Sequence, residues 1–194
     1  MFDISEYNRE FYRTCAVHIE ELSSYSPNYI NWLNLCKTLH HEQYDKSGRE
    51  YFRHCASVAY IAYELCLGLD ETIIDMNTII CTALFHDVLE DVENGREKLV
   101  HALKKDSSIR INEIIKSLRI LDHSPEVEYG CYINRILDSN NSTSIFVKYA
   151  DILDHIANLP FIEDGATRTR FEKKYHNLTK IFHEKTCELG SRLI

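Results

Sequence analysis

Hydrophobic residues recur along most of this chain at intervals of three and four positions, the spacing that places them on one face of an α-helix. The chain has only three prolines and six glycines, and most of them fall between the periodic stretches. No stretch alternates between apolar and polar positions as a strand would, and no internal repeat is visible. The pattern predicts an all-α protein with helices over residues 5–22, 26–40, 50–67, 71–91, 97–105, 109–121, 124–137, 145–159 and 169–189.

The predicted helix over residues 71–91 is hydrophobic on all sides for most of its length, which is typical of a buried helix. It ends in four polar side chains that can bind metals: His86, Asp87, Glu90 and Asp91. On a continuous helix, Glu90 would lie one turn beyond His86, and Asp91 one turn beyond Asp87. His86 and Asp87 could then contact one cation, while the two following acids point past it.

Two further candidate ligands lie on other predicted helices, His54 on the third and Asp151 near the end of the chain. Two imidazoles and two carboxylates suit Mn²⁺, Fe²⁺ or Zn²⁺ and leave coordination positions for water and substrate. Ligands from separate helices have no fixed spacing in sequence, so the pattern alone leaves alternatives open. His54 could be a core histidine bonded to a carbonyl, and Asp151 could form a buried salt bridge with Arg53 or Lys148.

The composition is that of an ordinary globular protein, with 44% hydrophobic and 27% charged residues among 194. A net charge of −8 argues against general binding to nucleic acid or acidic membranes. Seven scattered cysteines and a polar N-terminus lead us to expect a reducing, cytoplasmic location, and no apolar run is long enough to span a membrane. We expect one compact unit, with a helical extension over residues 1–35 and the main domain over residues 36–194.

Four segments resemble the HD-domain metal-dependent phosphohydrolases, and most closely the hydrolase domain of RelA/SpoT-type alarmone enzymes. Residues 39–54 are similar to A-H-x-x-Q-x-R-K-S-G-x-x-Y-x-x-H, and residues 83–91 match A-L-L-H-D-V-x-E-D except at Phe85. Residues 147–151 match V-K-x-A-D, and residues 126–136 resemble the E-x-Y-x-x-Y-I-x-R-I segment of small free-standing relatives. The resemblance covers roughly residues 36–185.

This resemblance implies an HD-domain helical bundle with a metal site between its helices. The residues at the positions of the family's metal ligands are His54, His86, Asp87 and Asp151. Glu90 and Asp91 occupy the positions of the acidic pair that activates the attacking, metal-bound water, so they are the predicted catalytic residues. The implied cofactor is a divalent metal, with Mn²⁺ expected first and Fe²⁺ or Zn²⁺ as alternatives.

The resemblance also implies contacts between the substrate and several residues, with Lys46 expected to bind a phosphate. The predicted substrate-binding residues are Lys46, Ser47, Tyr51, Lys148 and His155. The chain departs from the family at Asp45, where an arginine packs on guanine, and at His155, where an asparagine contacts the nucleotide. A carboxylate cannot stack on a base and repels phosphates, so we expect Asp45 to face the nucleotide and weaken base recognition.

The expected activity is metal-dependent hydrolysis of a nucleotide, with removal of the 3′-pyrophosphate of (p)ppGpp as the nearest family reaction. An alternative is a different nucleotide phosphate, such as a nucleoside monophosphate or a nicotinamide dinucleotide. A second alternative is a non-catalytic nucleotide sensor on the same fold, although a pure sensor has no use for a water-activating acidic pair. The oligomeric state stays open.

Overall fold

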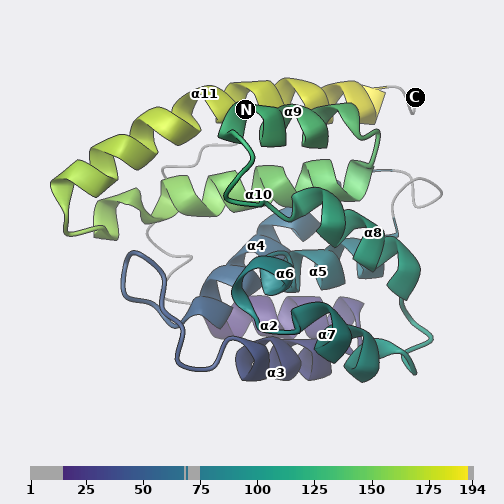
Figure 1. Cartoon of the computed structure of the whole chain (residues 1–194). Coiled ribbons are helices and arrows are strands. Elements are labelled where there is room, and N and C mark those ends of the chain that lie inside the picture. The colour runs from purple at the N-terminus through teal and green to yellow at the C-terminus, as the bar shows by residue number, and fades with distance from the viewer. Residues whose placement is uncertain (1–14, 68, 70–74, 192–194) are drawn as a thin grey trace.

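The computed structural model describes residues 15–67, 69 and 75–191, and it confirms the all-α fold class (Figure 1). Within these residues the extended pairing is limited to an isolated bridge between Tyr44 and Glu50. The elements are α2 (Cys15–Tyr25), α3 (Tyr29–Leu39), α4 (Tyr51–Cys66), α5 (Met76–Leu84), α6 (Val88–Asp91), α7 (Gly95–Leu103), α8 (Ile111–Leu121), α9 (Tyr129–Asp138), α10 (Ser142–Asn158), the short 3₁₀ helix η2 (Leu159–Phe161) and α11 (Gly165–Ser191).

The core is formed by α4, α5 and α10, which pack on one another in the middle of the molecule (Figure 1). Every residue of α5 from Thr78 to Leu84 is buried, as the all-round hydrophobicity of this segment predicted. The helices α2 and α3 pack against α4, and the long α11 covers α10 from the other side. Three central helices therefore bring together residues that are far apart in sequence.

The predicted helix over residues 71–91 is not continuous, and this expectation was wrong. Helix α5 ends at Leu84, residues 85–87 form a turn, and Glu90 and Asp91 belong to the separate four-residue helix α6. The ring of His86 bonds through Nδ1 to the carbonyl oxygen of Ala83 at 2.8 Å. That side-chain bond satisfies a carbonyl at the helix end, where the helix itself supplies no donor. The predicted residues 71–74 lie outside the described part of the chain.

Other helix boundaries differ by a few residues for local reasons. The side chain of Asp75 accepts from the backbone N–H of Thr78, so α5 begins with a capped N-terminus immediately after Asp75. Helix α9 begins at Tyr129 and not near residue 124, because the carboxylate of Glu128 caps it by accepting from the N–H of Cys131 at 3.0 Å. Of the predicted first helix, residues 5–14 lie outside the described part, and α2 accounts for the remainder.

The predicted division after residue 35 falls inside α3, whose Trp32, Leu33 and Cys36 are buried. The division into an extension and a domain stays a prediction. None of the described helices combines the length and the uninterrupted hydrophobicity that crossing a membrane would require.

Candidate metal centre

Three central elements place the predicted ligands at one point. His54 lies on α4, His86 and Asp87 lie in the turn after α5, and Asp151 lies on α10. The Nε2 atom of His86 is 2.9 Å from Asp87 Oδ2 and 3.7 Å from Asp151 Oδ1. The Nε2 atom of His54 is 3.8 Å from the same oxygen of Asp87 and 3.5 Å from the same oxygen of Asp151. The structure therefore brings the four side chains together, with one donor atom of each facing the others.

The two histidines are held by their other ring nitrogens. Nδ1 of His54 bonds to Asp154 Oδ2 at 2.7 Å, and Nδ1 of His86 bonds to the carbonyl of Ala83 at 2.8 Å. Both partners are acceptors, so each ring donates from Nδ1 and directs Nε2 into the cluster, where its lone pair could bind a metal. Histidines that bind metals in proteins are oriented in the same way, by a carboxylate or a carbonyl on the distal nitrogen.

Three atoms of this cluster are buried without a hydrogen-bond partner: His54 Nε2, His86 Nε2 and Asp151 Oδ1. A buried polar atom that lacks a partner costs about 1–3 kcal/mol, so three such atoms facing one point call for a bound group. Ligands about 2.1 Å from a common ion lie about 3.0 Å apart at a right angle and about 3.4 Å apart at a tetrahedral angle. The spacings of 2.9–3.8 Å bracket these values, so the residues present fit a divalent cation with small shifts of the side chains.

The electrostatics of the cluster favour positive charge. Burial opposes protonation of His54, but its hydrogen bond to Asp154 and the nearby carboxylate of Asp87 raise its pKa to about 10. Burial likewise opposes ionisation of Asp87, and the neighbouring His86 nevertheless holds the pKa of this carboxyl well below its usual range. The second oxygen of Asp151 is occupied, because Lys148 Nζ donates to Oδ2 at 2.8 Å. A buried salt bridge to Lys148, one of the alternatives for Asp151, is therefore present, while Oδ1 faces the histidines of the cluster.

The two predicted catalytic acids lie beside this cluster on α6. Glu90 Oε1 accepts the backbone N–H of His123 at 2.6 Å, which fixes the side chain. Burial and then the charge of Asp87 raise the pKa of Glu90 to about 7, and the same two causes raise the pKa of Asp91. A carboxyl group with a pKa near neutrality is suited to accept and release a proton in catalysis.

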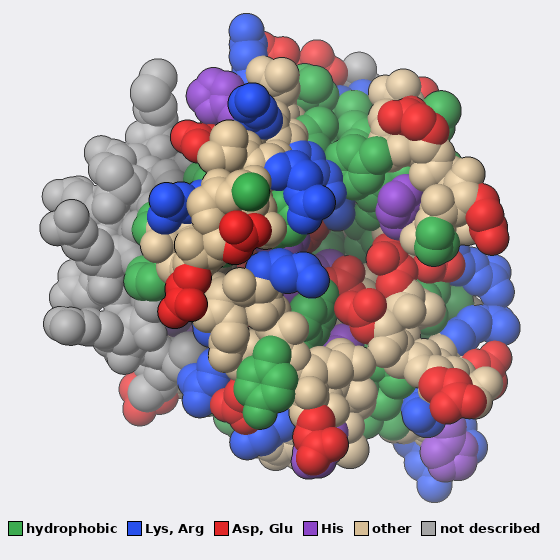
Figure 2. All heavy atoms as spheres, turned by 60° about the vertical axis from the view of Figure 1, so that its left-hand side comes forward, with side chains coloured by type: hydrophobic (Ala, Val, Ile, Leu, Met, Phe, Trp, Pro, Cys, Tyr) green, Lys and Arg blue, Asp and Glu red, His purple; other side chains and the backbone are tan. Residues whose placement is uncertain are grey.

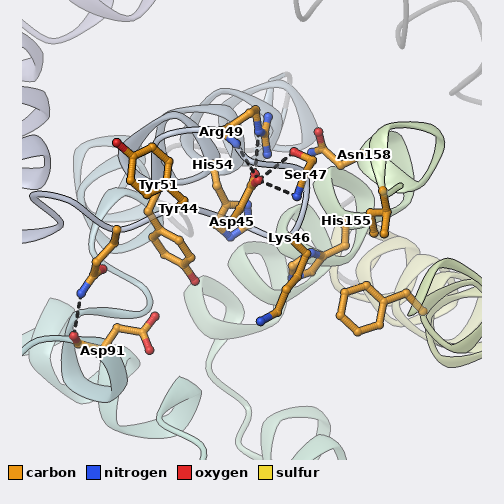
Figure 3. Close-up of a pocket in the computed structure, with 13 residues that line it drawn as sticks. Tyr44, Asp45, Lys46, Ser47, Arg49, Tyr51, His54, Asp91, His155 and Asn158 are labelled. Carbon is orange, nitrogen blue, oxygen red and sulfur yellow. Dashed lines mark hydrogen bonds and ion pairs between the residues drawn. The ribbon is translucent and has the colours of Figure 1, made fainter. Parts of the chain in front are cut away.

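A cavity of about 440 Å³ opens beside the cluster and is lined by Gln43, Tyr44, Asp45, Lys46, Ser47, Arg49, Tyr51, His54, Asp91, His155, Asn158, Ile162 and Phe171 (Figure 3). Figure 2 shows basic, acidic and histidine side chains meeting near the middle of one face of the molecule. Of the predicted substrate-binding residues, Lys46, Ser47, Tyr51 and His155 line this cavity. Lys148 does not line it, because its ammonium group lies against Asp151.

Two of these residues also contact the candidate ligands. The hydroxyl of Tyr51 donates to Asp87 Oδ2 at 2.6 Å, so Tyr51 orients a predicted ligand. The Nε2 atom of His155 is 3.1 Å from Asp151 Oδ1, and its ring stacks between those of His54 and Tyr175. The substrate-binding roles of both residues stay predictions.

The expectation that the charge of Asp45 faces the nucleotide stays a prediction, but both carboxylate oxygens already accept hydrogen bonds within the loop. Its Oδ1 accepts from the backbone N–H and the hydroxyl of Ser47 and from the backbone N–H of Arg49, at 2.7–3.0 Å. Its Oδ2 accepts from Arg49 Nε at 2.7 Å. Figure 3 shows the carboxylate turned back into its own loop, while Tyr44 and Lys46 extend away from it. Asp45 therefore shapes the loop that carries Lys46, and its charge is neutralised there.

Sequence reasoning missed the residues behind His54. Asp154 Oδ2 also accepts from Arg49 Nη2 at 2.9 Å and from Asn158 Nδ2 at 2.9 Å, so the loop and the ligand share one buried carboxylate. Burial opposes ionisation of Asp154, but His54 and Arg49 hold its pKa well below the usual range. The available signal was the spacing of Asp151, Asp154 and Asn158, which places the three residues on one face of α10.

Comparison with known protein families matches residues 51–159 to the family described as HD domain. The matched segment covers more than half of the chain, from the start of α4 to the beginning of η2, and contains all six residues predicted to bind metal or act in catalysis. The loop with Asp45, Lys46 and Ser47 lies before it. Comparisons with curated proteins and with solved structures found no match.

Proposed function

Because the chain belongs to the HD-domain family, we propose that it is a metal-dependent phosphohydrolase acting on a nucleotide, with the metal held by His54, His86, Asp87 and Asp151. One observation carries this proposal: the buried, unpartnered atoms His54 Nε2, His86 Nε2 and Asp151 Oδ1 face one point beside an open cavity. Nitrogen and oxygen donors in this mixture suit Mn²⁺, with Fe²⁺ and Zn²⁺ as alternatives.

A divalent cation in this centre would polarise a phosphoryl oxygen and make a bound water a stronger acid. The chain supplies the proton acceptor and its support. Glu90 is fixed by the N–H of His123, and its pKa of about 7 allows it to take a proton near neutral pH. Asp91 lines the cavity and has a raised pKa of the same origin, so it can share or pass on that proton.

The cavity supports a nucleotide as the substrate. Lys46 supplies a cation for a phosphate from a loop that Asp45 and Arg49 hold in shape. Phe171 and Tyr44 offer aromatic faces, and such faces stack on any base with little sequence preference. We therefore propose (p)ppGpp, hydrolysed at its 3′-pyrophosphate, as the first substrate to test. Other nucleotide phosphates come second, with a looser base preference than a dedicated alarmone hydrolase would show.

The test is a substrate panel measured with Mn²⁺ and with the metal removed by a chelator. The panel contains guanosine alarmones, nucleoside monophosphates and nicotinamide dinucleotides. We expect phosphate or pyrophosphate release that depends on metal. Binding of a nucleotide without turnover of any compound would instead support the non-catalytic sensor. The absence of both binding and turnover for every compound would refute the proposal.

A double variant separates metal binding from turnover. Glu90→Gln with Asp91→Asn should leave the metal content near that of the wild type and reduce kcat by a factor of about 100 or more, since a positioned proton acceptor contributes about 10²–10⁴-fold. The matched control is Glu93→Gln with Glu97→Gln, which removes the same charge from exposed positions nearby. Turnover that survives in the Glu90/Asp91 variant would place the proton acceptor elsewhere.

A further inference from the structure

A second group of possible metal ligands lies behind the candidate centre. Cys36 on α3, His40 at the C-terminal end of α3 and Cys55 on α4 each offer one donor atom, and the three atoms lie within 4.8 Å of one another. Both cysteines are fully buried, and His40 is 2% exposed. The group shares no residue with the proposed ligand set of His54, His86, Asp87 and Asp151.

The hydrogen bonds of His40 define which ring nitrogen is free. Gln43 Nε2 donates to the backbone oxygen of Asp91 at 2.9 Å, so its Oε1 is the atom that faces His40 Nδ1 at 2.6 Å. His40 therefore carries its proton on Nδ1 and presents a lone pair on Nε2. This Nε2 is buried without a hydrogen-bond partner, as are the Nε2 atoms of His54 and His86. An amide oxygen on the distal nitrogen orients the ring as it does in metal sites.

We propose that Cys36, His40 and Cys55 form a second, structural metal site that takes Zn²⁺. Thiolate and imidazole are the ligands that Zn²⁺ prefers in closed sites. Two thiolates and a neutral imidazole balance the two charges of the ion, so the assembled site is neutral and can be buried at low cost. Binding displaces both thiol protons to the solvent.

A fourth ligand is also at hand. The carbonyl oxygen of Leu84 is 3.2 Å from Cys36 Sγ, and it now accepts the hydrogen bond of that thiol. Loss of the thiol proton on metal binding frees this oxygen, which completes a set of four donors of the number that structural zinc sites use. Leu84 is the last residue of α5, so the proposed ion would join α3, α4 and the end of α5.

The position links the second site to the first. Cys55 follows His54, Leu84 precedes His86 by two residues, and Gln43 connects His40 to the backbone of Asp91. An ion held by Cys36, His40 and Cys55 would therefore brace the segments that carry the candidate ligands and the acidic pair. It would touch no substrate, because it is enclosed by the core.

Cobalt substitution distinguishes the two sites without measuring activity. The full-length chain is reduced, stripped of metal and titrated with Co²⁺, and its near-ultraviolet absorption is recorded. Co²⁺ bound to thiolates gives sulfur-to-metal charge-transfer bands, whereas the proposed nitrogen and oxygen ligands of the first centre give none. We expect these bands to appear, to saturate at one thiolate-bound ion per chain and to disappear when Zn²⁺ is added.

The variants Cys36→Ser, Cys55→Ser and His40→Gln should each weaken or abolish these bands. Cys66→Ser, at a buried cysteine of α4 outside the group, should leave them unchanged. Asp151→Asn should also leave them unchanged while weakening binding at the first centre, which separates this proposal from the proposed function. If a cysteine variant does not fold, as judged by circular dichroism, the wild-type titration and His40→Gln still decide. Reduced wild-type protein without charge-transfer bands would overturn the proposal.

Discussion

The carboxylate of Asp154 is the point at which the structure can be tested most directly. It is completely buried, and its Oδ2 accepts from His54 Nδ1, Arg49 Nη2 and Asn158 Nδ2 at 2.7–2.9 Å. Asp154→Asn keeps the size of the side chain and removes its charge. The amide oxygen can occupy the position of Oδ2, but it carries no charge to balance Arg49 or to strengthen the bond from His54, and charge-assisted hydrogen bonds are about twice as strong as neutral ones.

The expected size of the effect follows from the role of Asp154 behind a ligand. Loss of such a partner lowers metal affinity by about 10–100-fold, which corresponds to about 1.4–2.7 kcal/mol. Without metal the variant should also be less stable, because removing one partner of a buried ion pair costs up to about 3–5 kcal/mol. Arg49 retains its bond to Asp45, so we expect the lower part of that range.

Metal affinity is measured by competition between the protein and a chelating dye for Mn²⁺, and stability by thermal unfolding with and without the metal. The control is Asp164→Asn, the same substitution at an exposed residue that accepts from the N–H of Thr167 at the start of α11. Asparagine can still cap the helix, so this control removes one exposed charge outside the proposed ligand set and should leave the affinity unchanged. An Asp154→Asn protein that is folded and binds Mn²⁺ as tightly as the wild type would refute the orienting role of Asp154.

Three further substitutions test other parts of the structure. Gly95→Ala should lower the unfolding free energy by about 1–3 kcal/mol, because the added Cβ would lie 2.1 Å from a backbone oxygen of α6. The control Gly165→Ala, whose added Cβ would meet no atom within 4 Å, should be nearly neutral. Equal melting temperatures of the two variants would contradict this prediction. Asp106→Asn should destabilise the fold at pH 7 by about 1 kcal/mol. Partial burial by itself would raise the pKa of Asp106, but hydrogen bonds from Ser108 and Trp32 lower it overall. The ionised carboxylate therefore stabilises the fold above the pKa of the unfolded chain, and this stabilisation is lost as the pH falls. The unfolding free energy of the variant should therefore change less with pH in the acid range than that of the wild type. An unchanged pH dependence would exclude the contact. Asp45→Arg should reduce turnover and not improve it, since arginine cannot accept the four bonds that shape the loop; faster (p)ppGpp hydrolysis would support the view that this residue faces the base.

Most of the helices could be predicted because their signal is local. In α8, the buried residues Ile114, Ile115, Leu118 and Leu121 repeat at three- and four-residue spacing, and the sequence places this helix to within two residues. A helix closes its own hydrogen bonds between residues four apart, so a window of about ten residues contains the information. The motifs that resemble the HD family also lie in short segments, and they indicated the same family that the comparison identified.

The turn at residues 85–87 could not be predicted in this way. Phe85 continues the apolar pattern of α5 into the turn, and the break depends on His86 bonding to Ala83 while its other nitrogen faces His54 and Asp151. Those partners come from α4 and α10, and their positions are unknown until the core is packed.

The sequence by itself determined most of the helices and the resemblance to the HD family, and it nominated the residues that we propose as metal ligands. Only the tertiary structure decided what each polar atom faces. Arg49 bonds both to Asp45 and to Asp154, a residue 105 positions away, and these bonds show that Asp45 supports the loop. A buried charge must be compensated by whatever group the fold brings near it, and that compensation is a property of the packed core that no local pattern contains.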